Sequence, residues 1–223
     1  MKGILFSAIE IDLDQYQNPE KAKQMRAYMK DHFPYFGIQS PIRRQVVNDN
    51  WKNHKLGKLE HLYDFVSKCW DQNEREWQYV GMDVAGKCKK LYNETTITFA
   101  EKLITSKSWW DTVDWIASHM VGHCFKKYPD LRDKKIELWM ASDDIWLQRT
   151  CLIFQLKYKE DTDFNLMRAL ILDLKSSKEF FIQKGAGWAL RQYSKFRPDL
   201  VKEFIESNPD LPSLTKREGL KYC

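Results

Sequence analysis

Four residues in the second half of the chain could act together on one ligand: Trp110, Asp114, Arg149 and Trp188. A carboxylate beside electron-rich indole faces attracts a positive charge, and a guanidinium group binds an anion such as phosphate. Trp110 and Asp114 are four residues apart, so they share one face if this segment is helical. Arg149 and Trp188 follow at roughly one and two lengths of the repeat that the chain contains. A stack of repeats could therefore bring all four side chains to one patch.

Each of these residues also has an ordinary structural explanation. A tryptophan in a helical repeat usually packs in the core, and this chain has nine of them. Asp114 could belong to a solvated face, and Arg149 could form an ion pair across repeats, with Asp114 itself as one partner. Residue types and spacing alone leave both interpretations open.

The segment Ser106–Asp114, which reads SKSWWDTVD, predicts the start of the helix that carries the first two residues. Ser108 is followed three residues later by Asp111, the pattern of a capping box with Ser108 as the N-cap. Core positions then follow at helical spacing on one face, namely Trp109, Val113, Ile116 and Met120. We expect Trp110 and Asp114 to occupy a neighbouring face that the core does not need.

A short motif recurs along the chain: Asn or Ser, three residues, then a large aromatic residue. Its aromatic residues are spaced 33, 36 and 35 positions apart and are Trp77, Trp110, Trp146 and Phe181. Each motif is expected to begin a helix, and each is preceded by another expected helix, over residues 59–70, 95–105, 131–141 and 163–175. Helix pairs at a period of about 35 residues predict an all-α fold, an α-solenoid of stacked antiparallel helix pairs of the HEAT-like or ARM-like type. We expect the second helix of each pair, which is the helix that the motif begins, to lie along one surface of the stack.

Helices are also expected before the first and after the last of these helix pairs. Asn18-Pro-Glu is expected to begin an amphipathic helix over residues 18–33, and a further helix is expected from about residue 42 to residue 51. Thr215-Lys-Arg-Glu218 has the pattern of another capping box and predicts a short last helix. The prediction for residues 1–223 is a single repeat domain.

Composition excludes several classes of protein. With 14% aromatic residues, nine Gly and seven Pro, the chain is neither disordered nor rich in turns, and its net charge of +5 is compatible with a polyanionic partner. The five cysteines show no C-x-x-C spacing, and no apolar run is long enough for a membrane span. We therefore expect a soluble protein of the cytoplasm.

Motifs for nucleotide-dependent or metal-dependent chemistry are missing. The sequence has no P-loop, no zinc-protease helix, no nucleophile elbow and no dinucleotide fingerprint. The adjacent pair His123–Cys124 has no partner at a ligand spacing, so we expect it to be packed. The prediction is a protein with no metal and no cofactor.

Three motifs in order closely resemble the bacterial DNA alkylation repair glycosylases of the AlkD type, which are HEAT-like repeat proteins. They are WWDTVD, ending at Asp114, IWLQR, ending at Arg149, and SKEFFIQK followed by GW at Gly187 and Trp188. The resemblance also covers Asn18-Pro-Glu and the stretch from Ala27 to Lys30, and so extends from about residue 18 to residue 221. It implies that Trp110, Asp114, Arg149 and Trp188 fall on active-site positions. It also implies that Tyr28 is an aromatic residue that faces DNA.

The activity that this resemblance implies is removal of cationic purines alkylated at N3 or N7, such as 3-methyladenine and 7-methylguanine, from double-stranded DNA. Hydrolysis of the N-glycosidic bond would start base excision repair and leave an abasic site. Asp114 would stabilise the oxocarbenium-like sugar and position water, because a leaving base that departs neutral needs no general acid. Trp110 and Trp188 would contact the lesion and sugar, and Arg149 would hold a phosphate.

Further DNA contacts are expected from Lys178, Phe180 and Phe181 of the third motif. No lysine stands out as a nucleophile, so no strand-cleaving lyase step is expected, and we expect a monomer. Two other classes of function stay open: a non-catalytic solenoid that binds nucleic acid, and a scaffold for other proteins. A scaffold has no need of a carboxylate in a basic groove, and a phosphate binder would be weakened by one.

Overall fold

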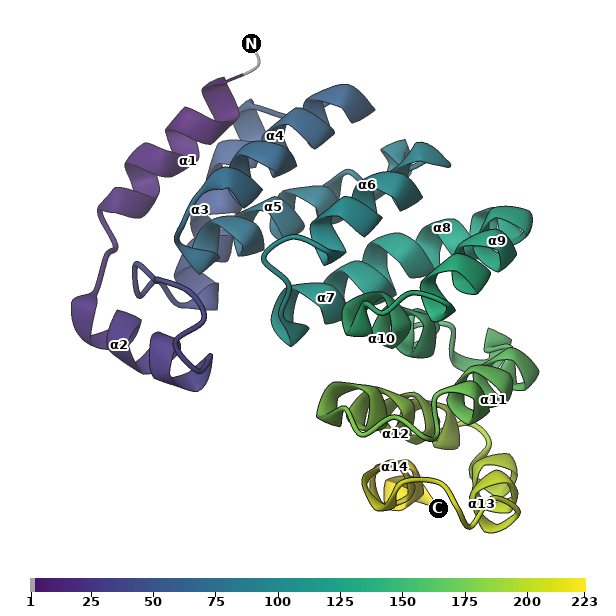
Figure 1. Ribbon diagram of the computed structural model, residues 1–223. Helices are drawn as coiled ribbons and strands as arrows, with labels where there is room; N and C mark the ends of the chain where they lie inside the picture. The colour runs from purple at the N-terminus through teal and green to yellow at the C-terminus, as the bar shows by residue number, and fades with distance from the viewer. Residues whose placement is uncertain (1–2) are drawn as a thin grey trace. The chain divides into compact units, whose positions relative to one another are not determined.

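The computed structural model describes residues 3–223, and within them the regular elements are helices, with no strand (Figure 1). The chain divides between Tyr92 and Asn93 into two compact units. The all-α prediction is confirmed. A single domain over residues 1–223 stays a prediction.

The helices of the first unit are α1 (Ile4–Asp14), α2 (Pro19–Tyr28), α3 (Ser40–Asn53), α4 (Leu59–Asp71) and α5 (Arg75–Lys87), with a 3-10 turn at Lys89–Leu91. Helix α3 packs against α1 and α5, and α4 packs against α5. The predicted start of α2 is confirmed, since the side chain of Asn18 accepts a hydrogen bond from the backbone N–H of Lys21. The helix ends at Tyr28 rather than near residue 33, because Lys30 and Asp31 adopt positive φ angles of 57°.

A buried carboxylate fixes the loop between α2 and α3. Glu76 of α5 accepts hydrogen bonds from the backbone N–H groups of Phe36, Gly37 and Ile38, at 2.9–3.2 Å. Burial raises the pKa of Glu76, while these three donors act to lower it. Gly37 has a φ of +86°, and a Cβ there would lie 2.0 Å from the carbonyl oxygen of Asn18, so no larger residue fits.

The helices of the second unit are α6 (Thr95–Ile104), α7 (Trp110–Ile116), α8 (Gly122–Lys127), α9 (Pro129–Met140), α10 (Ile145–Ile153), α11 (Phe164–Asp173), α12 (Phe180–Ser194), α13 (Pro198–Glu206) and α14 (Ser213–Gly219). A π-helical segment, Ala117–Val121, joins α7 to α8. Turns of 3-10 helix follow at Lys159–Asp161 and Leu220–Tyr222. The helices begin where the recurring motif predicts them, within a few residues.

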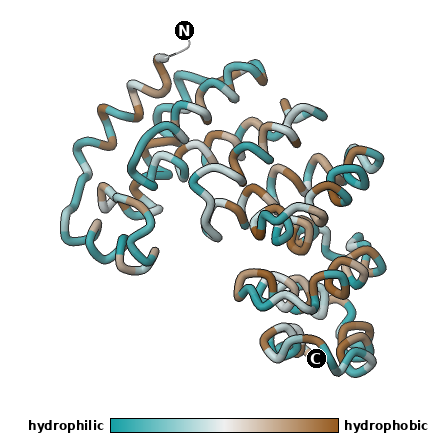
Figure 2. Tube along the Cα trace, in the orientation of Figure 1, coloured by the Kyte–Doolittle hydropathy of each residue, from teal (hydrophilic) through white to brown (hydrophobic). Residues whose placement is uncertain are grey.

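Helices α7, α10, α12 and α14 form one side of this unit, and α9, α11 and α13 form the other (Figure 1). Helix α10 packs against both α7 and α12, and α12 packs against α14. Hydrophobic and hydrophilic residues alternate along the helices in Figure 2, as expected for elements that bury one face. Stacked helix pairs with the second helices along one surface are therefore confirmed for this unit.

A glutamine in the first turn of several second helices fixes the turn before it. The side-chain amide of Gln148 donates to the carbonyl oxygens of Met140 and Ser142. Gln183 donates in the same way to Ser177, and Gln78 of the first unit does so to Cys69 and Gln72. These bonds satisfy carbonyl groups at the end of the preceding helix and in the turn that follows it. The repeat is thus held by polar contacts as well as by its apolar core.

Both predicted capping boxes are wrong. The N-cap of α7 is Trp109, which is extended (φ −160°, ψ 160°), and the hydroxyl of Ser108 donates backwards to the carbonyl oxygen of Ile104. Helix α14 begins at Ser213, so Thr215 lies inside it and donates to the carbonyl oxygen of Gln183 on α12. In both cases the hydroxyl donates to a carbonyl group of another helix, α6 for Ser108 and α12 for Thr215, instead of stabilising a helix start.

Glu218 anchors α14 to α12. Its carboxylate is 4% exposed and contacts Lys184, Arg191 and Lys221 at 2.7–2.9 Å. The ammonium groups of Lys184 and Lys221 hold the pKa of Glu218 at about 2, below the usual 4.5. The carboxylate therefore stabilises the folded state fully above about pH 4.5, and this contribution is lost as the pH falls towards 2.

We expect Glu218→Gln to lower the melting temperature at pH 7 by about 4–8 °C, since charged hydrogen bonds of this kind contribute about 2 kcal/mol. The difference from the wild type should shrink between pH 4.5 and pH 2. Thermal unfolding followed by circular dichroism measures both effects. Glu206→Gln, which removes an exposed ion pair of 3.9 Å on α13, is the control and should change little. An equal effect of both variants would contradict the assignment.

Candidate active site

Aromatic rings from three consecutive repeats meet at the N-terminal ends of α7, α10 and α12. The ring of Trp109 lies 5.7 Å from that of Trp146 and 5.1 Å from that of Phe181, and the latter two rings are 4.9 Å apart. The motif spacing predicted Trp110 for this repeat position, but Trp109 fills it. Trp110 is instead the first residue of α7, half-buried and one turn before Asp114.

Asp114 of α7 and Arg149 of α10 form a bidentate ion pair. The Nε and Nη2 atoms of Arg149 each donate to one carboxylate oxygen of Asp114, both at 2.8 Å. The side chain of Arg149 is 3% exposed and that of Asp114 is 14% exposed. This is the ion pair across repeats that the sequence left open for Arg149, and it is the strong, geometrically specific form of such a pair.

The guanidinium group has a third contact that fixes its plane. Its Nη1 atom donates to the carbonyl oxygen of Phe181 at 2.5 Å, at the start of α12. Gly185, one turn further along α12, makes room for it, because a Cβ there would lie 3.0 Å from Nη1. Arg149 is therefore held by α7 and α12 together. The buried side chain is not available in this arrangement as the phosphate clamp that the resemblance implied.

Burial raises the pKa of Asp114, and the hydrogen bonds and charge of Arg149 oppose this shift. The nearby Asp111 adds a smaller effect that also raises it. Without Arg149 a carboxyl group in this position would be more readily neutral. The guanidinium group is thus what favours a charged carboxylate here.

Asp114 opens onto a cleft of about 340 Å³ in the second unit. The cleft is lined by Asp114, Trp115, Ser118, His119, Leu156, Lys157, Trp188 and Gln192. Two of the four predicted site residues, Asp114 and Trp188, therefore line one cleft. Arg149 does not line the cleft, but it holds the carboxylate of Asp114 through their ion pair. Trp110 is absent from this lining, although it lies on the same helix as Asp114.

Three cleft residues on the helical run of Asp114, namely Trp115, Ser118 and His119, were not predicted from the sequence. The rings of Trp115 and His119 stack with centroids 4.6 Å apart and 9° between their planes. The hydroxyl of Ser118 donates to the carbonyl oxygen of Asp114 at 2.8 Å. Ser118 and His119 lie in the π-helical segment, and single π turns are frequent at functional sites. Apolar periodicity carries no signal for such a turn.

The predicted DNA-contacting residues differ in exposure. Tyr28, at the end of α2 in the first unit, is 72% exposed, and Phe180 of α12 is 57% exposed. Lys178 is also exposed, whereas Phe181 is half-buried within the aromatic cluster. Phe181 thus has a packing role, and contact with DNA stays a prediction for all four residues.

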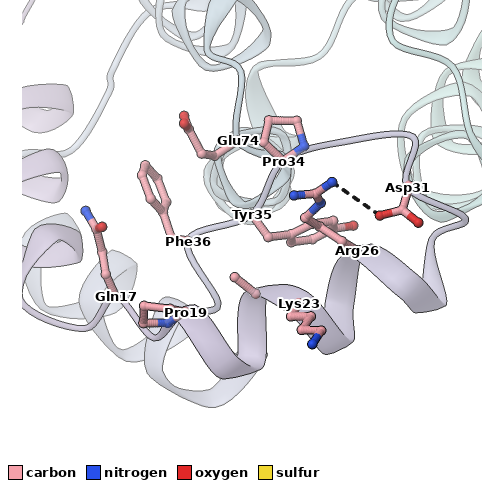
Figure 3. A pocket seen from close by; sticks show the side chains of 10 residues that line it. Gln17, Pro19, Lys23, Arg26, Asp31, Pro34, Tyr35, Phe36 and Glu74 are labelled. Carbon is pink, nitrogen blue, oxygen red and sulfur yellow. Dashed lines mark ion pairs between the residues drawn. The ribbon is translucent and has the colours of Figure 1, made fainter.

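The first unit has a groove of about 760 Å³ between α2 and the loop that follows it (Figure 3). Arg26 and Asp31 form an exposed ion pair of 3.4 Å there. Lys23, Tyr35 and Phe36 also line this groove. None of the four predicted active-site residues lines this groove.

Within residues 3–223 no group of His, Cys, Asp or Glu side chains is arranged to hold a metal ion. In the same part of the chain no helix is long and apolar enough to cross a membrane.

The stacked helix pairs show that this is an all-α helical-repeat protein. The ion pair of Asp114 and Arg149, at a cleft lined by aromatic side chains, is its candidate enzymatic site. The family model for DNA alkylation repair enzymes matches residues 9–223. The chain belongs to this family, as the resemblance of its three motifs indicated.

Two solved structures are similar to this chain. A predicted DNA alkylation repair enzyme from Enterococcus faecalis is 33% identical and has a TM-score of 0.84, covering 92% of this chain and 96% of that one. AlkD2 from Streptococcus mutans is 18% identical with a TM-score of 0.61, covering 90% of this chain and 98% of that one, and shows a similar fold. No curated protein sequence matches the chain.

Proposed function

We propose that this protein is a monofunctional DNA glycosylase that hydrolyses the N-glycosidic bond of cationic N3-alkylated or N7-alkylated purines in duplex DNA. The observation that carries the proposal is the carboxylate of Asp114, which Arg149 favours in its charged form at the edge of a cleft shared with Trp188. A glycosylase that releases a cationic base needs a negative charge of this kind near the sugar of the damaged nucleotide.

The chemistry needs few protein groups. Alkylation at N3 or N7 places a positive charge on the purine, so the base departs neutral when the bond from C1′ to nitrogen breaks. The sugar then carries the positive charge. Unit charges about 4 Å apart at an effective dielectric near 20 attract with about 4 kcal/mol, and the neighbouring guanidinium offsets part of this. Asp114 is thereby expected to supply about 10²–10³-fold in rate.

Aromatic faces supply the remaining attraction for the cationic base and sugar. Trp188 lines the cleft, and Trp110 lies one helical turn before Asp114. A cation over an indole face gains about 0.5–2 kcal/mol. We assign to both tryptophans contact with the lesion or its sugar. Arg149, held against Asp114, positions the carboxylate.

The test is release of 7-methylguanine or 3-methyladenine from methylated duplex DNA by the purified protein. Appearance of free base with an alkali-labile abasic site and an intact strand supports the proposal. Binding of DNA without release of base would favour the non-catalytic nucleic-acid-binding alternative. Absence of both binding and release would favour a protein scaffold.

Lys157 takes the role of phosphate contact that Arg149 cannot fill. Its side chain is exposed and lines the cleft with Asp114 and Trp188. We expect Lys157→Gln to weaken binding to duplex DNA by about 3–10-fold and to lower the slope of log K against log salt concentration by about 1. Titrations by fluorescence anisotropy at several salt concentrations measure both. Lys134→Gln, an exposed lysine on α9 at the other side of the stack, is the matched control. Equal slopes for the two variants would count against a phosphate contact at Lys157.

A further inference from the structure

Helix α12 carries two cations beside Trp188 of the cleft. Lys184 lies four residues before this tryptophan and Arg191 three residues after it, and all three side chains are half-buried. Residues at this spacing are neighbours on one side of a helix, so the two cations flank the indole ring. A lysine or arginine side chain that flanks an aromatic ring can bind to its face.

A carboxylate from α14 binds both of these cations. One oxygen of Glu218 contacts Nζ of Lys184 at 2.8 Å, and the other accepts a hydrogen bond from Nη1 of Arg191 at 2.7 Å. Helix α14 lies directly against α12 here (Figure 1), because a Cβ on Gly187 would be only 2.6 Å from the Cβ of Glu218. Glu218 therefore spans the part of α12 that carries Trp188.

The next cation in the chain also has partners near the C-terminus of the chain and on its own helix. Nζ of Lys195 donates to the side-chain oxygen of Gln192 at 3.0 Å and lies 5.2 Å from the centre of the Tyr222 ring. In the described part of the chain, no lysine or arginine group lies over the ring of Trp188. The cations nearest to this ring in sequence are thus bound elsewhere.

A free cation beside Trp188 would oppose the proposed reaction in two ways. It would occupy the electron-rich face that is available to a cationic purine or sugar. It would also repel the positive charge that develops near Asp114. In an ion pair with Glu218, each cation has a fixed position and a compensating negative charge.

We propose that Glu218 is a positioning residue of the glycosylase site, which keeps both flanking cations off the ring of Trp188 and so leaves this ring for the cationic lesion. The inference rests on the proposed glycosylase function. It gives α14 a part in the recognition of damage, exerted through Trp188, in addition to its part in stability.

The experiment measures two quantities well below the melting temperature of each variant: single-turnover release of 7-methylguanine from methylated duplex DNA, and binding of undamaged duplex. We expect Glu218→Gln to release base about 10-fold more slowly and to bind undamaged DNA about 3–10-fold more tightly, because it frees two cations beside the cleft. A triple variant that adds Lys184→Met and Arg191→Met should recover the wild-type rate within threefold. Mere loss of structure would weaken release and binding together, and the triple variant would not recover.

A second pair of variants tests the same effect with Glu218 intact. Gln192 lines the cleft one helical turn after Trp188. Gln192→Lys places a cation there that Glu218 does not bind, and it should slow release about 10-fold. Gln192→Met is the matched neutral control and should stay within threefold of the wild type. If Glu218→Gln does not fold, this pair decides, and equal rates for its two members would overturn the proposal.

Glu206→Gln makes the same change of charge on α13, where the carboxylate is exposed, and should alter neither release nor binding. Release by folded Glu218→Gln within threefold of the wild type, or a triple variant as slow as Glu218→Gln, would overturn the role of Glu218 and leave the glycosylase proposal intact. No release by the wild type would instead refute the glycosylase proposal, and this inference with it.

Discussion

Asp114→Asn is expected to lower the rate of base release from methylated duplex DNA by about 10²–10³-fold. The substitution keeps the shape of the side chain and removes its charge, so it removes the attraction for the developing cation. Binding of undamaged DNA should remain or become tighter, because the substitution removes a negative charge from the surface that we propose to face the phosphates. Single-turnover kinetics of base release and anisotropy titrations separate the two effects.

Folding is the main alternative cause of lost activity, since Asp114→Asn leaves Arg149 buried with a weaker partner. Asp111→Asn is the matched control, because this half-buried carboxylate belongs to the same helix, one turn earlier. Its rate of base release should stay within threefold of the wild-type rate. Release by Asp114→Asn within threefold of the wild type, with the variant shown to be folded by circular dichroism, would remove Asp114 from the mechanism.

The repeat was predictable because its signal lies in local sequence. A polar residue, a fixed spacing and an aromatic residue mark the start of each second helix, and the aromatic rings of consecutive repeats do pack on one another. The two capping-box predictions were wrong because each hydroxyl group could form a hydrogen bond either at its own helix start or with another helix. Ser108 and Thr215 both donate to a carbonyl of another helix, and no rule about local caps contains that helix.

The site was predictable in part for the same reason. A carboxylate at 114 and a guanidinium at 149 are one repeat apart, and stacked repeats brought them within 2.8 Å. The spacing could not show that the pair is buried, which turns Arg149 from a surface cation into a support for Asp114. Nor could it show His119, because the π-helical segment changes the helical register after Asp114, and the register decides which side chains face the cleft.

Arg149→Met is the second substitution with a large expected effect. Met has a similar length and no charge, so the carboxylate of Asp114 remains buried without a partner. The pKa of Asp114, which burial already raises, should rise further. We expect the rate of base release at pH 7 to fall by about 10–100-fold and to recover partly at higher pH, where the carboxyl group ionises again. A residue that only bound phosphate would instead change DNA affinity and its salt dependence, with no shift of the pH profile.

The stability of the Arg149→Met variant should also depend on the protonation of Asp114. An unpaired buried charge costs about 3–5 kcal/mol, so Arg149→Met is expected to be destabilised by this amount at a pH where Asp114 is charged. The loss becomes smaller as the pH falls, because the folded state with a raised pKa binds a proton more tightly than the unfolded chain does. Urea unfolding at pH 5 and pH 8 measures the difference. Arg43→Met, which breaks the pair of the buried Arg43 with Asp83 at 2.9 Å in the first unit and leaves Asp83 only the more distant Arg44 at 3.8 Å, should also cost stability and leave the pH profile of base release unchanged. If both variants change activity alike, loss of folding explains the result; if only Arg149→Met shifts the pH profile, the guanidinium group controls the charge of Asp114.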